Sequence, residues 1–349
     1  MASFEAGQVA RQLLAEMPEL TFARVGEAAL ENARRNLTVA GRGWSLAELR
    51  GRRFGSIDAG LVMAAGPSVA RRDPAAAIRE IGFDGTIVAT ESSLYYLLRN
   101  GIVPHLVVTL DPHATRIVRW FGDPALHQRN LAADDYFRRQ DMDADFSREL
   151  AVNQEVLQLI DRYGPQMRIA LATSASEAVV GRVLATGMEI YWWNPMFDDP
   201  LEAGSLTRQL QDLNGYPAVN AGGNVGSACW MMADAVLGLS DVALVGVDFS
   251  YYDDTPRTKT QYYHEAVNLV GAENLDAIYV RIFNPHIGQW FYTDPAYLWY
   301  RETFLEMAKD AMGRVHNCTE GGILFGDGIE FEPLRTFLRR FGRAKASVG

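Results

Sequence analysis

The sequence predicts an α/β fold built on a mainly parallel sheet, for two reasons. From about residue 56 onward, short apolar runs alternate with amphipathic segments. The runs are mainly apolar, which is typical of strands that helices cover on both faces. The runs that we expect as strands are residues 61–65, 86–90, 106–110, 168–172, 189–193 and 242–247. This pattern indicates a Rossmann-like sheet flanked by helices, with ligands beyond the carboxyl ends of its strands.

Helix signals lie between the expected strands. Asp73 followed by Pro74 predicts a helix start, because a carboxylate can cap the first turn and proline suits its first position. Residues 92–100 fit the next helix, and Gly101 ends it. Ser45 and Glu48 have the spacing of a capping box, which predicts a short helix before the first strand.

The chain divides into two expected regions. Residues 1–55 are predicted to be an N-terminal helical appendage, and residues 56–345 a Rossmann-like transferase domain. Within that domain, residues 112–166 are charged and include the run 133–139, so we expect a helical insertion. The insertion could be a lid, an oligomer contact or a solvated helical pair, which is the usual role of a charged segment.

Composition limits the partners and the compartment. Asp and Glu number 43 against 33 Lys and Arg, giving a net charge of −10, which argues against a nucleic-acid partner. Cys229 and Cys318 have no neighbour that would complete a zinc site, so we expect two reduced thiols. No signal peptide is predicted, because the N-terminus carries Glu5 and has no apolar core segment. No transmembrane helix is predicted either, because residues 213–233, the longest uncharged stretch, contain Gly, Asn and Pro. These features favour a cytoplasmic protein.

Two glycine turns are the first candidate binding elements. One follows the first strand, and the other precedes an expected helix at 228–237. Backbone N–H groups at such turns can approach a phosphate, although glycines there can also be purely structural. The residues concerned are Gly66, Pro67 and Ser68 in the first turn, and Gly223, Asn224, Gly226 and Ser227 in the second.

Three acidic residues follow expected strands, namely Glu91, Asp111 and Asp248. Each could contact a ribose, a base, a metal or an acceptor hydroxyl, or could simply cap a helix. Asp111 and Asp248 both end very apolar strands. If those strands are neighbours, the two carboxylates could hold Mg²⁺, which prefers oxygen ligands.

The stretch from 250 to 300 is rich in aromatic and polar residues. Tyrosine hydroxyls such as those of Tyr251, Tyr262 and Tyr263 can bind phosphate oxygens, although aromatic packing is the alternative. No histidine pair has the His-x-x-x-His spacing of a metal site. His286 is one of several histidines that could act as a base.

Several motifs occur together in the order of a known family. They are Gly66-Pro67-Ser68, Ile102-Val103-Pro104 leading to Leu110-Asp111-Pro112, Gly223-Asn224-Val225-Gly226 leading to Leu244-Val245-Gly246-Val247-Asp248, and Cys318-Thr319-Glu320-Gly321-Gly322. The series, over roughly residues 25 to 335, resembles the motility-associated-factor proteins, which are glycosyltransferase-like. That domain is grouped with 6-hydroxymethylpterin diphosphokinase-like proteins, and its fold is similar to that of a bacterial sialyltransferase family.

The resemblance implies a nucleotide lying across the two glycine turns. Gly66, Pro67, Ser68, Asn224, Gly226 and Ser227 would surround its phosphates and ribose. Glu91 stands where the family usually has Asp or Asn near the nucleotide. Tyr251 and either Tyr262 or Tyr263 would contact the departing phosphate. The base is open between His286 and Asp248, because residues 289–292 lack the histidine that sialyltransferases have before a Thr-Asp pair.

Three functions follow as hypotheses. The first is transfer of a nonulosonic-acid-type sugar from a CMP-sugar to a hydroxyl of a glycan, a protein such as flagellin, or a small molecule. The second is pyrophosphoryl transfer from Mg-ATP to a pterin alcohol, with Asp111 and Asp248 as metal ligands. The third is a non-catalytic nucleotide-binding module in flagellar or surface-glycan assembly.

Overall fold

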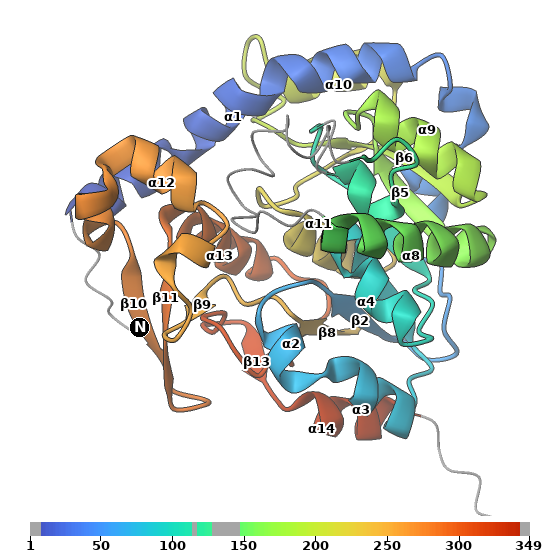
Figure 1. Cartoon of the computed structure of the whole chain (residues 1–349). Helices are drawn as coiled ribbons and strands as arrows, with labels where there is room; N and C mark the ends of the chain where they lie inside the picture. The colour runs from blue at the N-terminus through green and yellow to red at the C-terminus, as the bar shows by residue number, and fades with distance from the viewer. Residues whose placement is uncertain (1–7, 114–116, 128–146, 343–349) are drawn as a thin grey trace, which may run out of the picture.

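The computed structural model describes residues 8–113, 117–127 and 147–342, and it contains a ten-stranded parallel sheet (Figure 1). In spatial order the strands are β1 (Trp44–Ser45), β6 (Glu189–Pro195), β5 (Arg168–Ala172), β4 (Leu106–Val108), β3 (Thr86–Thr90), β2 (Ala59–Met63), β8 (Asp241–Val245), β12 (Arg314–Asn317) and β13 (Ile329–Phe331), with β7 (Ala218–Val219) beside β6. The predicted fold class is therefore confirmed. All six predicted strands are present, shifted by at most two residues at either end.

The order of the strands reverses once, between β2 and β8. From β2 the chain adds β3, β4, β5 and β6 on one side, and β8, β12 and β13 lie on the other. Parallel α/β sheets bind ligands at the carboxyl ends of their strands at such a switch point. The first glycine turn follows β2 and Asp248 follows β8, so the topology brings these two segments together.

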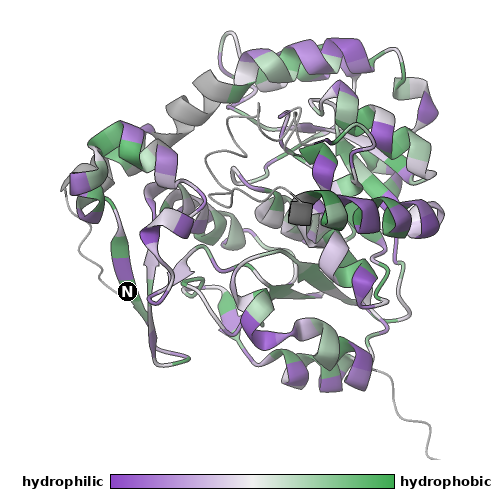
Figure 2. Cartoon of the chain, viewed as in Figure 1, coloured by the Kyte–Doolittle hydropathy of each residue, from purple (hydrophilic) through white to green (hydrophobic). Residues whose placement is uncertain are grey.

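Helices cover both faces of the sheet, and the alternation of side chains along β2 shows why. Leu61 and Met63 pack with Phe337 in the core under α3 and α14. Val62 points to the opposite face and packs with Ala228 of α11. The central strands are coloured as hydrophobic in Figure 2, as expected for strands that are buried on both faces.

The helices have the following bounds. They are α1 (Gln8–Asn36), α2 (Ser68–Arg72), α3 (Pro74–Ile81), α4 (Leu94–Arg99), α8 (Ser147–Tyr163), α9 (Glu177–Thr186), α10 (Leu206–Asn214), α11 (Val225–Met231), α12 (Tyr263–Val270), α13 (Pro295–Ala308) and α14 (Leu334–Phe341). A π-helical turn, Met232–Val236, continues α11. Figure 1 shows α2, α3 and α14 together at the bottom of the view. No helix in the described ranges is long and apolar enough to cross a membrane.

Part of the predicted N-terminal appendage joins the main sheet. The long helix α1 is held by two buried asparagines, since the Asn32 and Asn36 amides donate to backbone carbonyls of residues 173–175 after β5. The same region supplies β1, which pairs with β6, and a 3-10 helix (Leu46–Leu49) whose first turn Ser45 caps. The first 55 residues therefore contribute to the edge of the sheet as well as forming a helix.

The predicted insertion at 112–166 is only partly within the described residues. A 3-10 helix (Arg119–Phe121) and α8 are present, and α8 packs on α4. The charged run 133–139 lies outside the described residues. The aromatic segment after Asp248 forms a small antiparallel sheet that was not predicted, with the order β10 (Val280–Asn284), β11 (Gln289–Thr293) and β9 (Tyr251–Tyr252).

Candidate active site

A buried carboxylate, that of Asp248, lies at the switch point. The chain turns sharply after β8, because Gly246 and Phe249 both have positive φ angles, of 73° and 50°. This turn directs Asp248 toward the first glycine turn. The Ser68 backbone N–H donates to Oδ1 of Asp248 at 3.1 Å, and the Ser68 hydroxyl donates to Oδ2 at 2.7 Å. The strand ends of β2 and β8 are thus joined through one side chain.

Burial dominates the acidity of this carboxyl group. Removal from water raises the pKa of Asp248 to about 7, although the two hydrogen bonds from Ser68 and the charge of Arg72 act in the opposite direction. A carboxyl group with a pKa near 7 can exchange a proton at neutral pH, which an ordinary aspartate does poorly.

Glycine is required at three positions around Asp248, because the backbone passes too close to that residue to leave room for a Cβ. A Cβ on Gly66 would lie 2.1 Å from Oδ2 of Asp248, and one on Gly321 would lie 3.1 Å from Oδ1. Gly322 has a φ of 70°, and its Cβ would lie 2.2 Å from the carbonyl oxygen of Asp248. The glycines of two separate motifs therefore surround the same carboxylate.

A tyrosine and two arginines lie beside it. Burial raises the pKa of Tyr252, the charge of Asp248 raises it further, and Arg71 and Arg72 lower it. The Arg71 guanidinium lies over the Tyr252 ring, 3.9 Å from the centroid. Arg72 donates from Nε to the carbonyl of Glu320 at 2.9 Å. Positive charge therefore borders Asp248 on the α2 side.

A cavity of about 300 Å³ opens next to this group of residues. It lies between α2, the segment after β12 and the start of α14. Its polar lining consists of Ser68, Arg71, Arg72, Thr319, Glu320 and Arg335. Ser68 lines the cavity and its hydroxyl contacts Asp248, so this residue lies between the cavity and the buried carboxylate.

The structure does bring the two glycine turns together. A Cβ on Gly226 would lie 3.8 Å from Cβ of Ala64, just before the first turn. The polar groups of the second turn, however, satisfy each other. Oδ1 of Asn224 accepts from the Ser227 N–H at 2.9 Å, and its amide donates to the Ser227 hydroxyl at 2.8 Å. Gly223 packs against Trp299 of α13, where a Cβ would lie 2.5 Å from the ring.

The hydrogen-bond donors of Ser68 are also paired within the protein. Both donors that the sequence assigned to a phosphate, its N–H and its hydroxyl, point to Asp248 instead. Gly66 and Pro67 form the turn that holds Ser68 there. Glu91 is buried at the end of β3, and its charge acts together with burial to raise the pKa of Cys229 on α11.

Asp111 and Asp248 do not end neighbouring strands, so the condition for a shared Mg²⁺ site is not met. Asp111 follows β4 and Asp248 follows β8, and both β3 and β2 lie between those strands. Three strand spacings separate them by ~14 Å, which is too wide for one Mg²⁺. Asp111 instead accepts from the N–H of His113 at 2.8 Å. Within the described residues, no group of three His, Cys, Asp or Glu could hold a metal.

The other predicted catalytic residues lie apart from Asp248 and contact other groups. Tyr251 donates to Oδ2 of Asp294 and accepts from the N–H of Gln261, each at 3.0 Å. The Tyr262 hydroxyl is 3.2 Å from that of Tyr300. Tyr263 begins α12 and packs on His264, and the His286 ring stacks on Phe331 with centroids 4.8 Å apart.

Strand alternation explains which tyrosine lies at the site. Successive residues of β9 point to opposite faces, so when Tyr251 enters the aromatic cluster, Tyr252 faces Asp248. Tyr251 was a candidate site residue from the sequence, whereas Tyr252, Arg71 and Arg72 were not. The pair of arginines three and four residues after Ser68 was the available signal for positive charge at this site.

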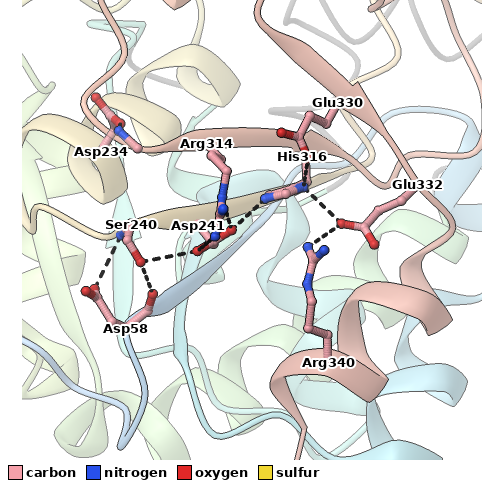
Figure 3. A network of polar contacts seen from close by, with 10 residues as sticks. Asp58, Asp234, Ser240, Asp241, Arg314, His316, Glu330, Glu332 and Arg340 are labelled. Carbon is pink, nitrogen blue, oxygen red and sulfur yellow. Dashed lines mark hydrogen bonds and ion pairs between the residues drawn. The ribbon is translucent and has the colours of Figure 1, made fainter.

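A second buried polar network occupies the opposite, amino end of β8 (Figure 3). Asp241 accepts two hydrogen bonds from Arg314 at 2.8 Å, and Nε2 of His316 lies 2.9 Å away. Burial alone would raise the pKa of Asp241, but Arg314 and His316 hold it below its usual value. Nδ1 of His316 lies 2.9 Å from Glu332, so this network ties β8, β12 and the segment after β13 together.

Comparison with known proteins supports the resemblance at the level of fold. The fold is similar to that of the MAf glycosyltransferase from Magnetospirillum magneticum AMB-1, with a TM-score of 0.51, 13% sequence identity and 89% of this chain covered. The match spans 39% of that longer protein. The sequence matches no protein-family model and no curated protein. At this identity the likeness is one of fold.

Proposed function

We propose that the protein is a glycosyltransferase-like enzyme that moves a sugar from a nucleotide donor to an acceptor hydroxyl, with a CMP-nonulosonate as the favoured donor. One observation carries the proposal. Ser68, a residue that lines the cavity, donates from its hydroxyl to a buried carboxyl group whose pKa is about 7. The pair sits at the switch point of a parallel sheet, where such folds bind their ligands.

In this mechanism, Ser68 relays a proton. The acceptor hydroxyl transfers its proton to Oγ of Ser68 while the Ser68 proton passes to Oδ2 of Asp248. The acceptor oxygen then forms a bond to the anomeric carbon, and the bond from that carbon to the phosphate oxygen breaks. Only the ionised form of Asp248 can accept the proton, so the rate should rise with pH through about 7.

The departing nucleotide carries the negative charge that is released. Arg72 lies close enough to Asp248 to lower its pKa, and it lines the same cavity as Ser68. A guanidinium placed there stabilises a phosphate through charge-assisted hydrogen bonds. The nucleotide would lie over the first glycine turn, with the second turn next to it.

A thermal-shift panel tests the proposal, using CMP, CDP, UDP, GDP and ATP with and without Mg²⁺. A ligand at one hundred times its dissociation constant stabilises a fold by about 2.7 kcal/mol. We expect CMP or CDP to raise the Tm independently of Mg²⁺. The rise should be smaller in Ser68→Ala and unchanged in Ser56→Ala, which alters an exposed serine. A rise with ATP that requires Mg²⁺, or no rise with any nucleotide, would overturn the proposal.

A further inference from the structure

The cavity between α2 and α14 is lined by more arginines than the proposed mechanism uses, since that mechanism needs only Arg72. Its volume of about 300 Å³ could hold several water molecules, so a phosphate group fits with room to spare. Three arginines line it, Arg71, Arg72 and Arg335, against one carboxylate, Glu320. The whole chain has a net charge of −10, so this concentration of cations is local.

The arginines retain hydrogen-bond donors for a ligand. Arg71 pairs with Asp254, and Arg335 pairs with Glu80 at 2.7 Å, but both pairs are exposed. Exposed pairs contribute little to stability and exchange readily. Each guanidinium has five N–H donors, and these pairs use only some of them. Guanidinium groups bind phosphate in a two-pronged geometry that suits this wall.

Glu320 is the one carboxylate that lines the cavity. Its backbone has a φ of 52°, a strained conformation that non-glycine residues seldom adopt. Its Oε2 accepts from the N–H of Leu334, the first residue of α14, at 3.2 Å. Its carbonyl oxygen accepts from Arg72. The side chain thus holds a negative charge at the start of α14, where it acts on Arg335, while Arg72 contacts the backbone of the same residue.

We propose that this cavity binds a phosphate group between Arg72 and Arg335, and that the Glu320 carboxylate competes with that phosphate for the same positive charge. The identity of the phosphate as the one on the departing nucleotide rests on the proposed function. The phosphate site itself does not, because it follows from the charges that line the cavity.

Inorganic phosphate, titrated calorimetrically into the full chain at low ionic strength, tests the site directly. We expect Arg335→Gln to weaken binding by about tenfold, because a charge-assisted hydrogen bond is lost. Arg340→Gln is the matched control. It lies on the same helix with similar exposure but pairs with Glu332, away from the cavity, and should bind as wild type does. Equal affinities of the two variants would overturn the site.

Glu320→Gln separates competition from a purely structural role. Glutamine can still accept from the Leu334 N–H but carries no negative charge. Phosphate should therefore bind the variant several-fold more tightly than it binds the wild type. Weaker or unchanged binding would overturn the role given to Glu320.

Repeating the titrations with CMP separates the two proposals. CMP binding that ignores Arg335 and Glu320 would refute the cavity alone. Phosphate binding that follows the predictions, without added affinity for any nucleotide, would refute the proposed function alone.

Discussion

The substitution Asp248→Asn isolates the energetic effect of the buried carboxyl group. Asparagine has nearly the same shape, can accept from the Ser68 N–H and can donate to its hydroxyl, but it does not titrate. In the wild type, the pKa of Asp248 is about 7 in the folded protein against 3.8 as the ordinary value. The folded state therefore binds an extra proton between those values. The stabilisation of the folded state by this proton is complete below about pH 4 and is lost as the pH rises through 7.

The pKa difference of Asp248 between the folded and unfolded states can be converted into a change in the free energy of unfolding. Between pH 5 and pH 8, this group alone should lower the free energy of unfolding of the wild type by about 2.5 kcal/mol. Urea unfolding followed by tryptophan fluorescence at several pH values measures it. Asp248→Asn should lack this loss, and Asp199→Asn, at an exposed aspartate, should retain it. Parallel pH profiles for the wild type and Asp248→Asn would show that the carboxyl group is not held in its neutral form by burial.

Three further predictions concern neighbouring features. Gly66→Ala should lower the free energy of unfolding by about 3 kcal/mol in urea titration, because the new Cβ would overlap Asp248. Gly181→Ala, within α9 and with open space around it, should instead raise it by about 0.5–1 kcal/mol. His316→Ala should destabilise by about 3 kcal/mol by leaving Asp241 with fewer partners. The pKa of Asp241 is below its usual 3.8, so that partnership stabilises above pH 4 and is lost in acid, and the variant should show a smaller acid-induced loss. Tyr251→Phe should cost about 1 kcal/mol of stability but leave CMP affinity unchanged, whereas Tyr252→Phe should weaken CMP binding, as calorimetry can show. A tighter-binding Tyr252→Phe, or a Gly66→Ala as stable as wild type, would contradict the site.

The central part of the fold could be predicted because its signals are local. A strand such as β2 is apolar along its whole length, and Pro74 and Gly101 mark helix boundaries within the chain itself. The strands that were missed have weaker signals. β12 contains Arg314 and His316, which are polar in sequence and lie beside Asp241 only after folding. The β10–β11 hairpin was missed because the aromatic residues of 250–300 were interpreted as packing or ligand contacts, and no strand was sought among them.

The site was predictable where one motif sufficed and not where the sheet order mattered. The Gly66 turn and Asp248 were both named, but their direct contact depends on β2 and β8 being adjacent. The strand order also rules out Asp111 as a partner of Asp248, because β3 and β2 lie between β4 and β8. The choice between Tyr251 and Tyr252 depends on which face of β9 meets the core, and local sequence does not reveal this.

Release of CMP from a CMP-nonulosonate donor is the measurement that tests the central claim most directly. It can be followed by chromatography with wild type, Asp248→Asn and Asp199→Asn, with and without added acceptor sugars. The mechanism predicts that the wild type and Asp199→Asn release CMP, faster as the pH rises through 7. Asp248→Asn should be at least about a hundredfold slower, the usual contribution of a catalytic base. Tight CMP binding by the wild type without release of CMP from the donor under any of these conditions would contradict the claim and identify a nucleotide-binding protein without transferase activity.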